Sequence, residues 1–120
     1  MLGVLRAKVA TALAQTATVL LATSGPAGLQ VSVCPSHSQD VRLFILIPDT
    51  SEHLVNLEQD TQVVVTTCAW QMRGHSRILA SPPPTLFKDS VWRRVIEVSP
   101  ARFEFTQADG LGAYETIDFD

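Results

Sequence analysis

The most informative stretch of the chain is residues 45–57, where an apolar run ends in Ile47 and Pro48 and a polar segment follows at once. That segment supplies three good helix N-cap residues in a row, Asp49, Thr50 and Ser51. A strand end that meets a helix N-terminus brings backbone N–H groups, hydroxyls and the positive end of the helix dipole to one spot. All of these favour an anion, so the junction predicts a phosphate-binding site.

The short helix after this junction is expected to run to about Glu58. Its apolar spacing predicts a buried stripe of Leu54, Val55 and Leu57. The other side chains would then face outward or toward a ligand, namely Glu52, His53, Asn56 and Gln59. His53 is therefore either a neighbour of the phosphate or an ordinary solvated residue.

A second group of candidate residues lies on the strand expected over residues 71–79. Alternation places four side chains on one face, Gln71, Arg73, His75 and Arg77, so that this face carries three potentially cationic groups. An Arg fork can hold a phosphate through two hydrogen bonds. The same face is also consistent with the solvent side of a sheet balanced by carboxylates, and both interpretations stay open.

Other chemistry has little support in the sequence. The two cysteines, Cys34 and Cys68, each lie in a strand-like run and are expected to be reduced and buried rather than bridged. Cys34 and His37 have a spacing that a metal could use, but no second cluster completes a zinc site. No Ser, Cys or Thr lies in a recognisable nucleophile motif.

Composition narrows the class of protein. The 120 residues are 46% hydrophobic, which fits a single domain over residues 1–120 with a core of its own. A net charge of −3 argues against nucleic acid as a partner. The longest apolar runs are far shorter than the roughly 18 residues of a membrane span, and the N-terminus lacks the pattern of a secretory signal. We therefore expect a cytoplasmic protein without a membrane partner.

The elements that position the candidate residues follow from hydrophobic periodicity. An amphipathic helix is expected from Leu2 to about Thr16, and Leu29, Val31 and Val33 are expected to form the dry face of the second strand. Strands are expected at 17–23, 29–34, 41–47, 61–68, 71–79, 91–98 and 101–106, with turns or connectors at 24–28, 35–40, 81–84, 99–100 and 107–112. Residues 113–120 form an acidic C-terminal tail, either frayed or packed on another subunit through its apolar side chains.

The expected fold is mainly β, with six or seven antiparallel strands, an N-terminal helix and a short helix after the third strand. Many short strands with hairpin turns in a small chain favour a closed barrel or a sandwich over an α/β layer fold.

This order of elements resembles a known family. The resemblance rests on three segments in this order, Val19-Leu-Leu-Ala-Thr23, residues 44–57 and Trp70-Gln-Met-Arg-Gly-His-Ser-Arg77. Over residues 1–106 the chain resembles the pyridoxamine 5′-phosphate oxidase-like family of FMN-binding split barrels. The resemblance implies a split β-barrel and a homodimer that holds FMN in a groove between subunits.

The resemblance also implies roles for particular residues. The phosphate and ribityl chain of FMN would be held by Ile47, Pro48, Asp49, Thr50 and Ser51. His53 stands where the family usually has Lys or Arg, which weakens the expected phosphate grip because His is cationic only part of the time near neutral pH. Arg73, with Gln71, would reach the phosphate or the edge of the flavin ring. Trp70 and Trp92 would cover the ring or the mouth of the substrate site, or would serve as anchors in the core or the dimer interface.

The C-terminal end departs from the family's name-giving enzyme. The Arg-rich signature that binds the substrate there is replaced by the acidic sequence of residues 114–120. Oxidation of pyridoxamine phosphate is therefore not expected. The resemblance implies a small FMN-dependent oxidoreductase with an unknown small-molecule substrate. The alternatives are a non-catalytic flavin-binding or sensing protein, a dimeric scaffold that has lost the cofactor, and the deazaflavin F420 or haem in place of FMN.

Overall fold

The computed structural model describes residues 2–80, 93–106 and 113–119 of the chain. Its elements are α1 (Leu2–Ala14), β1 (Thr18–Thr23), β2 (Gln30–Gln39), β3 (Arg42–Pro48), α2 (Glu52–Gln59), β4 (Gln62–Thr66), β5 (Trp70–Leu79), β6 (Arg93–Thr106) and β7 (Ala113–Asp118). The expected connector at 81–84, the expected loop at 107–112 and Trp92 lie outside the described residues.

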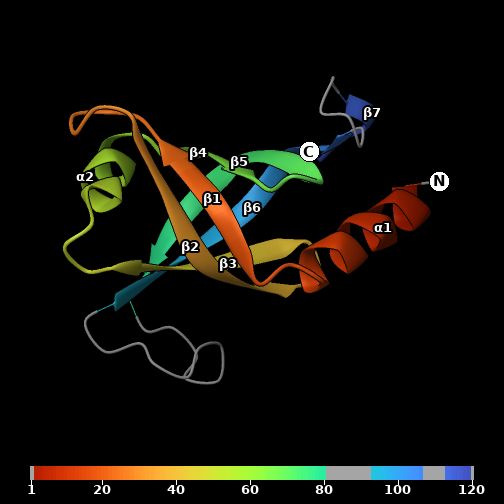
Figure 1. Ribbon diagram of the computed structural model, residues 1–120, viewed down its shortest axis with the longest axis horizontal. Helices are drawn as coiled ribbons and strands as arrows, with labels where there is room; N and C mark the ends of the chain where they lie inside the picture. The colour runs from red at the N-terminus through yellow and green to blue at the C-terminus, as the bar shows by residue number, and fades with distance from the viewer. Residues whose placement is uncertain (1, 81–92, 107–112, 120) are drawn as a thin grey trace.

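The strands form one antiparallel sheet that closes into a barrel. Its order is β3-β2-β1-β4-β5-β6-β7, and a further pairing of β3 with β6 closes the first six strands (Figure 1). The long strand β6 pairs with β3 through its first half and with β7 through its second half. The predicted fold class, a mainly β antiparallel barrel with an N-terminal helix and a short helix after the third strand, is confirmed.

The barrel is split between β2 and β3. These two strands pair only from Ser36 opposite Ile45 to Gln39 opposite Arg42. Beyond that point β2 continues along β1, while β3 continues along β6 as far as Pro48. The strands therefore diverge toward α2, and their facing edges are not paired with each other.

The inside of the barrel is filled by apolar side chains from every strand and from α1. Trp70 and Phe103 stack in this core with ring centroids 5.1 Å apart, and α1 contributes Val9 and Leu13. Helix α2 begins at the expected place, because Ser51 is its N-cap and the Ser51 Oγ accepts a hydrogen bond from the backbone N–H of His53 at 3.2 Å. No helix in the described part of the chain is long and apolar enough to cross a membrane.

Strand β2 has the reverse orientation from the one expected. Leu29, Val31 and Val33 are exposed, whereas Ser32 is half-buried and Cys34 is buried. Alternation shows which residues share a face of a strand, but it does not show which face meets the core. The prediction of a dry Leu29, Val31 and Val33 face was therefore wrong.

The turn expected at residues 35–40 is also wrong, because β2 runs on to Gln39 and the chain reverses at Asp40, whose φ is +56°. Pro35 is tolerated in this strand for a clear reason. The N–H of Ser36 bonds to the Ala17 carbonyl of the β1 side at 2.9 Å, so the nitrogen of Pro35 points the other way, toward the split. No ladder hydrogen bond is lost there.

Two further expectations at the C-terminal end are corrected. Ser99 and Pro100 do not separate two strands, because β6 is continuous through them. The register of β5 against β6 shifts between Arg73 and Gly74, next to the Gly74–Pro100 pair, and this irregularity accommodates the proline. Residues 113–118 are not a frayed tail, since β7 pairs with β6 outside the closed barrel and Ile117 is buried in the same hydrophobic core.

Candidate functional site

A slot opens where β2 and β3 diverge, and it contains the junction that the sequence singled out. Its volume is about 300 Å³. It is lined by Ser32, Val33, Cys34 and Pro35 of β2, by Leu46, Ile47 and Pro48 of β3, by Thr50, Ser51 and His53 around the start of α2, and by Arg93 of β6. Five of the nine predicted cofactor-binding residues are thus brought together: Ile47, Pro48, Thr50, Ser51 and His53. Asp49 is exposed and lies between two of them in the chain.

The slot has the chemical character of an anion site. The hydroxyl groups of Thr50 and Ser51 border it at the N-terminus of α2, where the helix dipole is positive. The unpaired edges of β2 and β3 add backbone groups that no neighbouring strand uses. A phosphate there would meet hydroxyl donors and the positive end of the α2 dipole, and the phosphate site expected at this junction stays a prediction.

Arg93 supplies the positive charge of the slot, and the sequence reasoning missed it. It lies opposite Pro48 in the pairing of β6 with β3, and it is exposed. Among the described residues no carboxylate forms an ion pair with it. Arg93 reaches the site through a pairing of strands 45 positions apart, which no local pattern could show; the only signal was the adjacent pair Arg93-Arg94 at the start of a strand.

His53 occupies the floor of the slot rather than its surface. Its side chain is only 2% exposed, which corrects the expectation that it faces outward. The Nδ1 atom lies 2.7 Å from the Thr23 Oγ1, and the Nε2 atom lies 3.0 Å from the Ser32 Oγ. Burial lowers the pKa of His53, so the ring is neutral at pH 7 and does not replace the charge of a Lys or Arg.

Asn56 was also expected to face outward, but it is fully buried. Its side chain fixes α2 to the β1–β2 connection through bonds to Ala27 N and Gly28 O, both 2.9 Å long. Val55, expected in the buried stripe, is instead exposed. The buried face of α2 is therefore partly polar, and it meets the polar inner face of β2.

Three predicted residues lie away from the slot. Trp70 is buried in the core, where its Nε1–H donates to the Thr16 Oγ1 at 3.4 Å. Gln71 is half-buried on the outer face of β5, and Arg73 is exposed on the same face. The predicted alternation of this strand is confirmed, but within one chain neither residue lines the slot.

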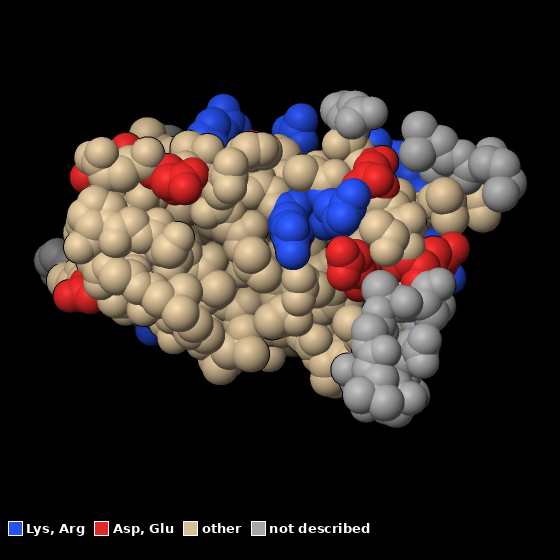
Figure 2. Space-filling view, turned by 90° about the horizontal axis from the view of Figure 1, so that it is seen from above, with Lys and Arg blue, Asp and Glu red and all other residues tan. Residues whose placement is uncertain are grey.

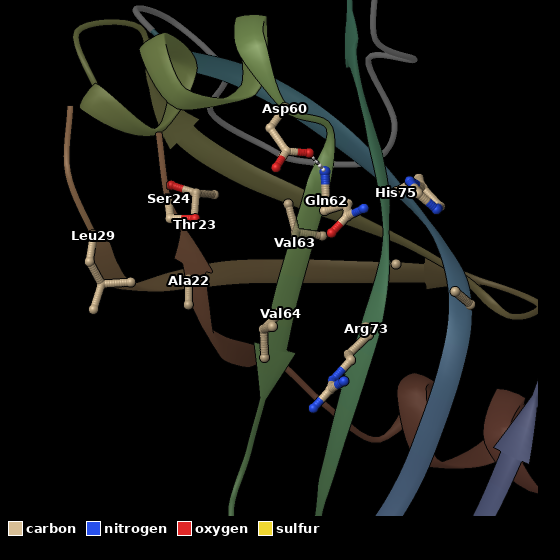
Figure 3. Close-up of a pocket in the computed structure, with 12 residues that line it drawn as sticks. Ala22, Thr23, Ser24, Leu29, Asp60, Gln62, Val63, Val64, Arg73 and His75 are labelled. Carbon is tan, nitrogen blue, oxygen red and sulfur yellow. Dashed lines mark hydrogen bonds between the residues drawn. The ribbon is translucent and has the colours of Figure 1, made fainter. Parts of the chain in front are cut away.

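Arg73 borders a second hollow, on the outer face of β1, β4 and β5, with a volume of about 350 Å³. Figure 3 shows Arg73 on the same side of the sheet as its cross-strand neighbours Val64 and Ala22. The linings of this hollow and of the slot have no residue in common. Within the described residues the slot and this hollow are therefore two different concave regions.

Both cysteines are free thiols. Cys34 and Cys68 are both unbridged, as expected, although Cys68 is exposed rather than buried. Burial raises the pKa of the Cys34 thiol at the floor of the slot, so it stays protonated and weakly nucleophilic. Across the described ranges, His, Cys, Asp and Glu side chains form no cluster that could hold a metal ion.

No protein-family model matches the sequence, and no curated protein matches it significantly. Solved structures do match. A Listeria innocua protein assigned as a pyridoxamine 5′-phosphate oxidase is 12% identical with a TM-score of 0.69, and the match covers 84% of this chain and 97% of that one. An F420 reductase is 18% identical with a TM-score of 0.60, covering 78% and 93%.

A haem-binding protein from Mycobacterium smegmatis is 15% identical with a TM-score of 0.68. That match covers 94% of this chain but only 57% of the other. Identities this low establish the fold alone. The chain has the split-barrel fold of the pyridoxamine 5′-phosphate oxidase-like proteins.

Proposed function

We propose that the chain is an FMN-binding flavoprotein and that the slot holds the phosphate and ribityl chain of the cofactor. The observation that carries this proposal is the convergence of Thr50, Ser51 and Arg93 on the opening between β2 and β3. A guanidinium and two hydroxyls at a helix N-terminus suit a phosphate monoester in both charge and geometry. Arg93, rather than His53, is then the cation of the site.

The size of the slot indicates which part of the cofactor it would hold. Its volume of about 300 Å³ lies at the lower end of the roughly 300–1,000 Å³ usual for small-molecule sites. A phosphate with its polyol chain suits such a space, and the flavin ring would lie at the mouth of the slot. The ring would there need cover from water by another surface.

We propose that a second copy of the chain supplies that cover. The outer face of β1 and β2 carries four exposed apolar side chains. Their exposed fractions are 39% for Leu20, 56% for Val31, 71% for Val33 and 74% for Leu29, which lies just before β2. Val33 belongs both to this apolar face and to the lining of the slot, so the two regions are continuous. Figure 2 shows a few acidic side chains over the α2 end and a group of basic and acidic side chains toward the end that holds α1 and β7, with mostly uncharged surface between them.

The proposed activity is that of a small oxidoreductase whose substrate is unknown. Bound flavin would supply the hydride or electron chemistry. The chain's own contribution is to hold the phosphate through Arg93 and the hydroxyls, and to shield the ring at the apolar face. Of the described residues that line the slot, Cys34 has a protonated thiol and His53 has both ring nitrogens hydrogen-bonded, so neither is placed to act as a nucleophile.

The comparisons support two other cofactors as second candidates. An F420 reductase and a haem-binding protein share this fold, which favours a deazaflavin or haem as the alternatives to FMN. A scaffold without cofactor is the remaining alternative, since His53 replaces the expected cation.

The visible absorption spectrum of the purified protein separates these candidates, followed by titration with FMN and with riboflavin, which lacks the phosphate. We expect a flavin spectrum or tight uptake of FMN, with riboflavin bound much more weakly. A colourless protein that takes up no FMN would refute the proposal, and a Soret band would favour haem.

A further inference from the structure

Four polar side chains form a continuous hydrogen-bonded row from the β1–β2 connection to the floor of the slot. The row runs from Asn56 to Thr23, then to His53 and finally to Ser32. The bonds that join them are 3.1, 2.7 and 3.0 Å long. Three of the four residues are at most 3% exposed, and Ser32, half-buried, lines the slot.

The backbone fixes the direction of the first bond in this row. The N–H of Ala27 donates to the Oδ1 of Asn56, and the Nδ2 of Asn56 donates to the carbonyl of Gly28. A backbone N–H can only donate and a carbonyl can only accept, so the orientation of the amide is determined. The second N–H of the Asn56 amide therefore donates to the Thr23 Oγ1.

The direction then passes along the row to Ser32. Because the hydroxyl of Thr23 already accepts from Asn56, its own proton is available for the Nδ1 of His53. If the Nδ1 of His53 carried the proton and donated it to Thr23, the buried Thr23 hydroxyl proton would have no partner, at a cost of about 1–3 kcal/mol. A neutral His53 that accepts at Nδ1 carries its proton on Nε2, and it donates that proton to the Ser32 Oγ.

We propose that Ser32 is a ligand-binding residue whose hydroxyl proton is aimed into the slot, and that Asn56, Thr23 and His53 are positioning residues that set this direction. Ser32 accepts from His53, and its proton has no other partner among the described residues. A ligand would have to offer an acceptor at this point, such as a phosphoryl oxygen or an oxygen of the ribityl chain. This role rests on the proposed use of the slot as a cofactor site, whereas the direction of the row does not.

The direction of the row is tested on the ligand-free protein. Long-range ¹H–¹⁵N NMR of the full chain labelled with ¹⁵N-histidine reports which ring nitrogen of His53 carries the proton, with His53→Asn identifying the signals. We expect the Nε2–H tautomer in the wild type and in Thr23→Ser, and a change in the ring ¹⁵N shifts in Thr23→Val. A ring protonated on Nδ1 alone in the wild type would overturn the proposal.

The role of Ser32 is tested by titration with FMN. Loss of the hydrogen bond from the Ser32 hydroxyl should weaken FMN binding about three- to tenfold in Ser32→Ala, with most of the affinity kept in Ser32→Thr. Ser36→Ala is the matched control, because Ser36 lies on the same face of β2 but bonds to the Thr16 carbonyl, away from the slot.

Equal FMN affinity in Ser32→Ala and the wild type would refute the role of Ser32 and leave the proposed function intact. A wild type that binds neither FMN nor inorganic phosphate would refute both. The NMR result stands apart from these outcomes, because it decides the direction of the row without any ligand.

Discussion

Replacing Arg93 with alanine tests the proposed cofactor site most directly. Among the described residues, Arg93 is the only charged side chain that lines the slot, and no carboxylate forms an ion pair with it. The neutral His53 cannot take over its charge. Arg93→Ala should therefore remove the main electrostatic attraction for the phosphate.

The size of the effect follows from the exposure of Arg93. A hydrogen bond to a charged group contributes about 1.5–3 kcal/mol, and solvent screening at an exposed side chain places Arg93 near the lower end of that range. About 1.5 kcal/mol corresponds to roughly a tenfold rise in the Kd for FMN. Arg93→Lys should keep part of the affinity, because lysine retains the charge but not the forked geometry.

Fluorescence titration with FMN and riboflavin measures this effect, with Arg94→Ala as the control. Arg94 is the next residue along β6, it pairs with Ile47 on the opposite face of the strand, and it does not line the slot. We expect Arg93→Ala to weaken FMN but not riboflavin, and Arg94→Ala to change neither. Equal effects of the two substitutions, or an equal loss of riboflavin, would refute the assignment of Arg93 to the phosphate.

Three further predictions concern stability and assembly. Gly74→Ala should destabilise the fold by about 1–3 kcal/mol in urea unfolding, because the new Cβ would lie 2.4 Å from the Ser99 carbonyl oxygen. Gly3→Ala is the control, since a Cβ there meets no atom within 4 Å and should not destabilise the fold. Burial lowers the pKa of His53 below its ordinary value near 6.5, so just below pH 6.5 the unfolded chain binds a proton at His53 that the folded chain does not. The stability of the fold should therefore decrease as the pH falls through about 6.5. His53→Asn should flatten that part of the stability–pH profile even though it lowers stability at pH 7, and an unchanged slope would contradict the argument. Val33→Lys should convert a dimer to a monomer in analytical ultracentrifugation, whereas Val4→Lys, on the exposed side of α1, should not.

Much of the fold follows from local patterns in the sequence. The end of β3 at Pro48 and the capped start of α2 depend on residues adjacent in the chain, and they were predicted within one or two positions. The outward face of β5 followed from simple alternation. The joining of β3 to β6, which places Arg93 at the slot, depends on contacts between distant segments and had no local signal.

The wrong predictions about β2 and α2 have one common cause. Each was based on the rule that apolar side chains face the core. That rule describes the average burial of single residues and does not show which faces of two packed elements meet each other. Here the polar inner face of β2 meets the polar face of α2, and the buried groups satisfy one another: no buried side-chain nitrogen or oxygen in the described residues lacks a partner. The apolar residues of β2 are then left outside, where they form the proposed dimer face.

This arrangement explains how a short helix can hold a binding site in place. An eight-residue helix has little stability of its own, so its position depends on what it is docked against. Apolar packing alone tolerates small shifts, whereas a buried polar network is favourable only when every bond is made. Because His53 and Asn56 each bond to two or more partners on the β1–β2 hairpin and its connection, α2 has one satisfied position. The hydroxyls of Thr50 and Ser51 at its N-terminus are consequently held at a fixed place beside the slot, which is the condition that recognition of a phosphate requires.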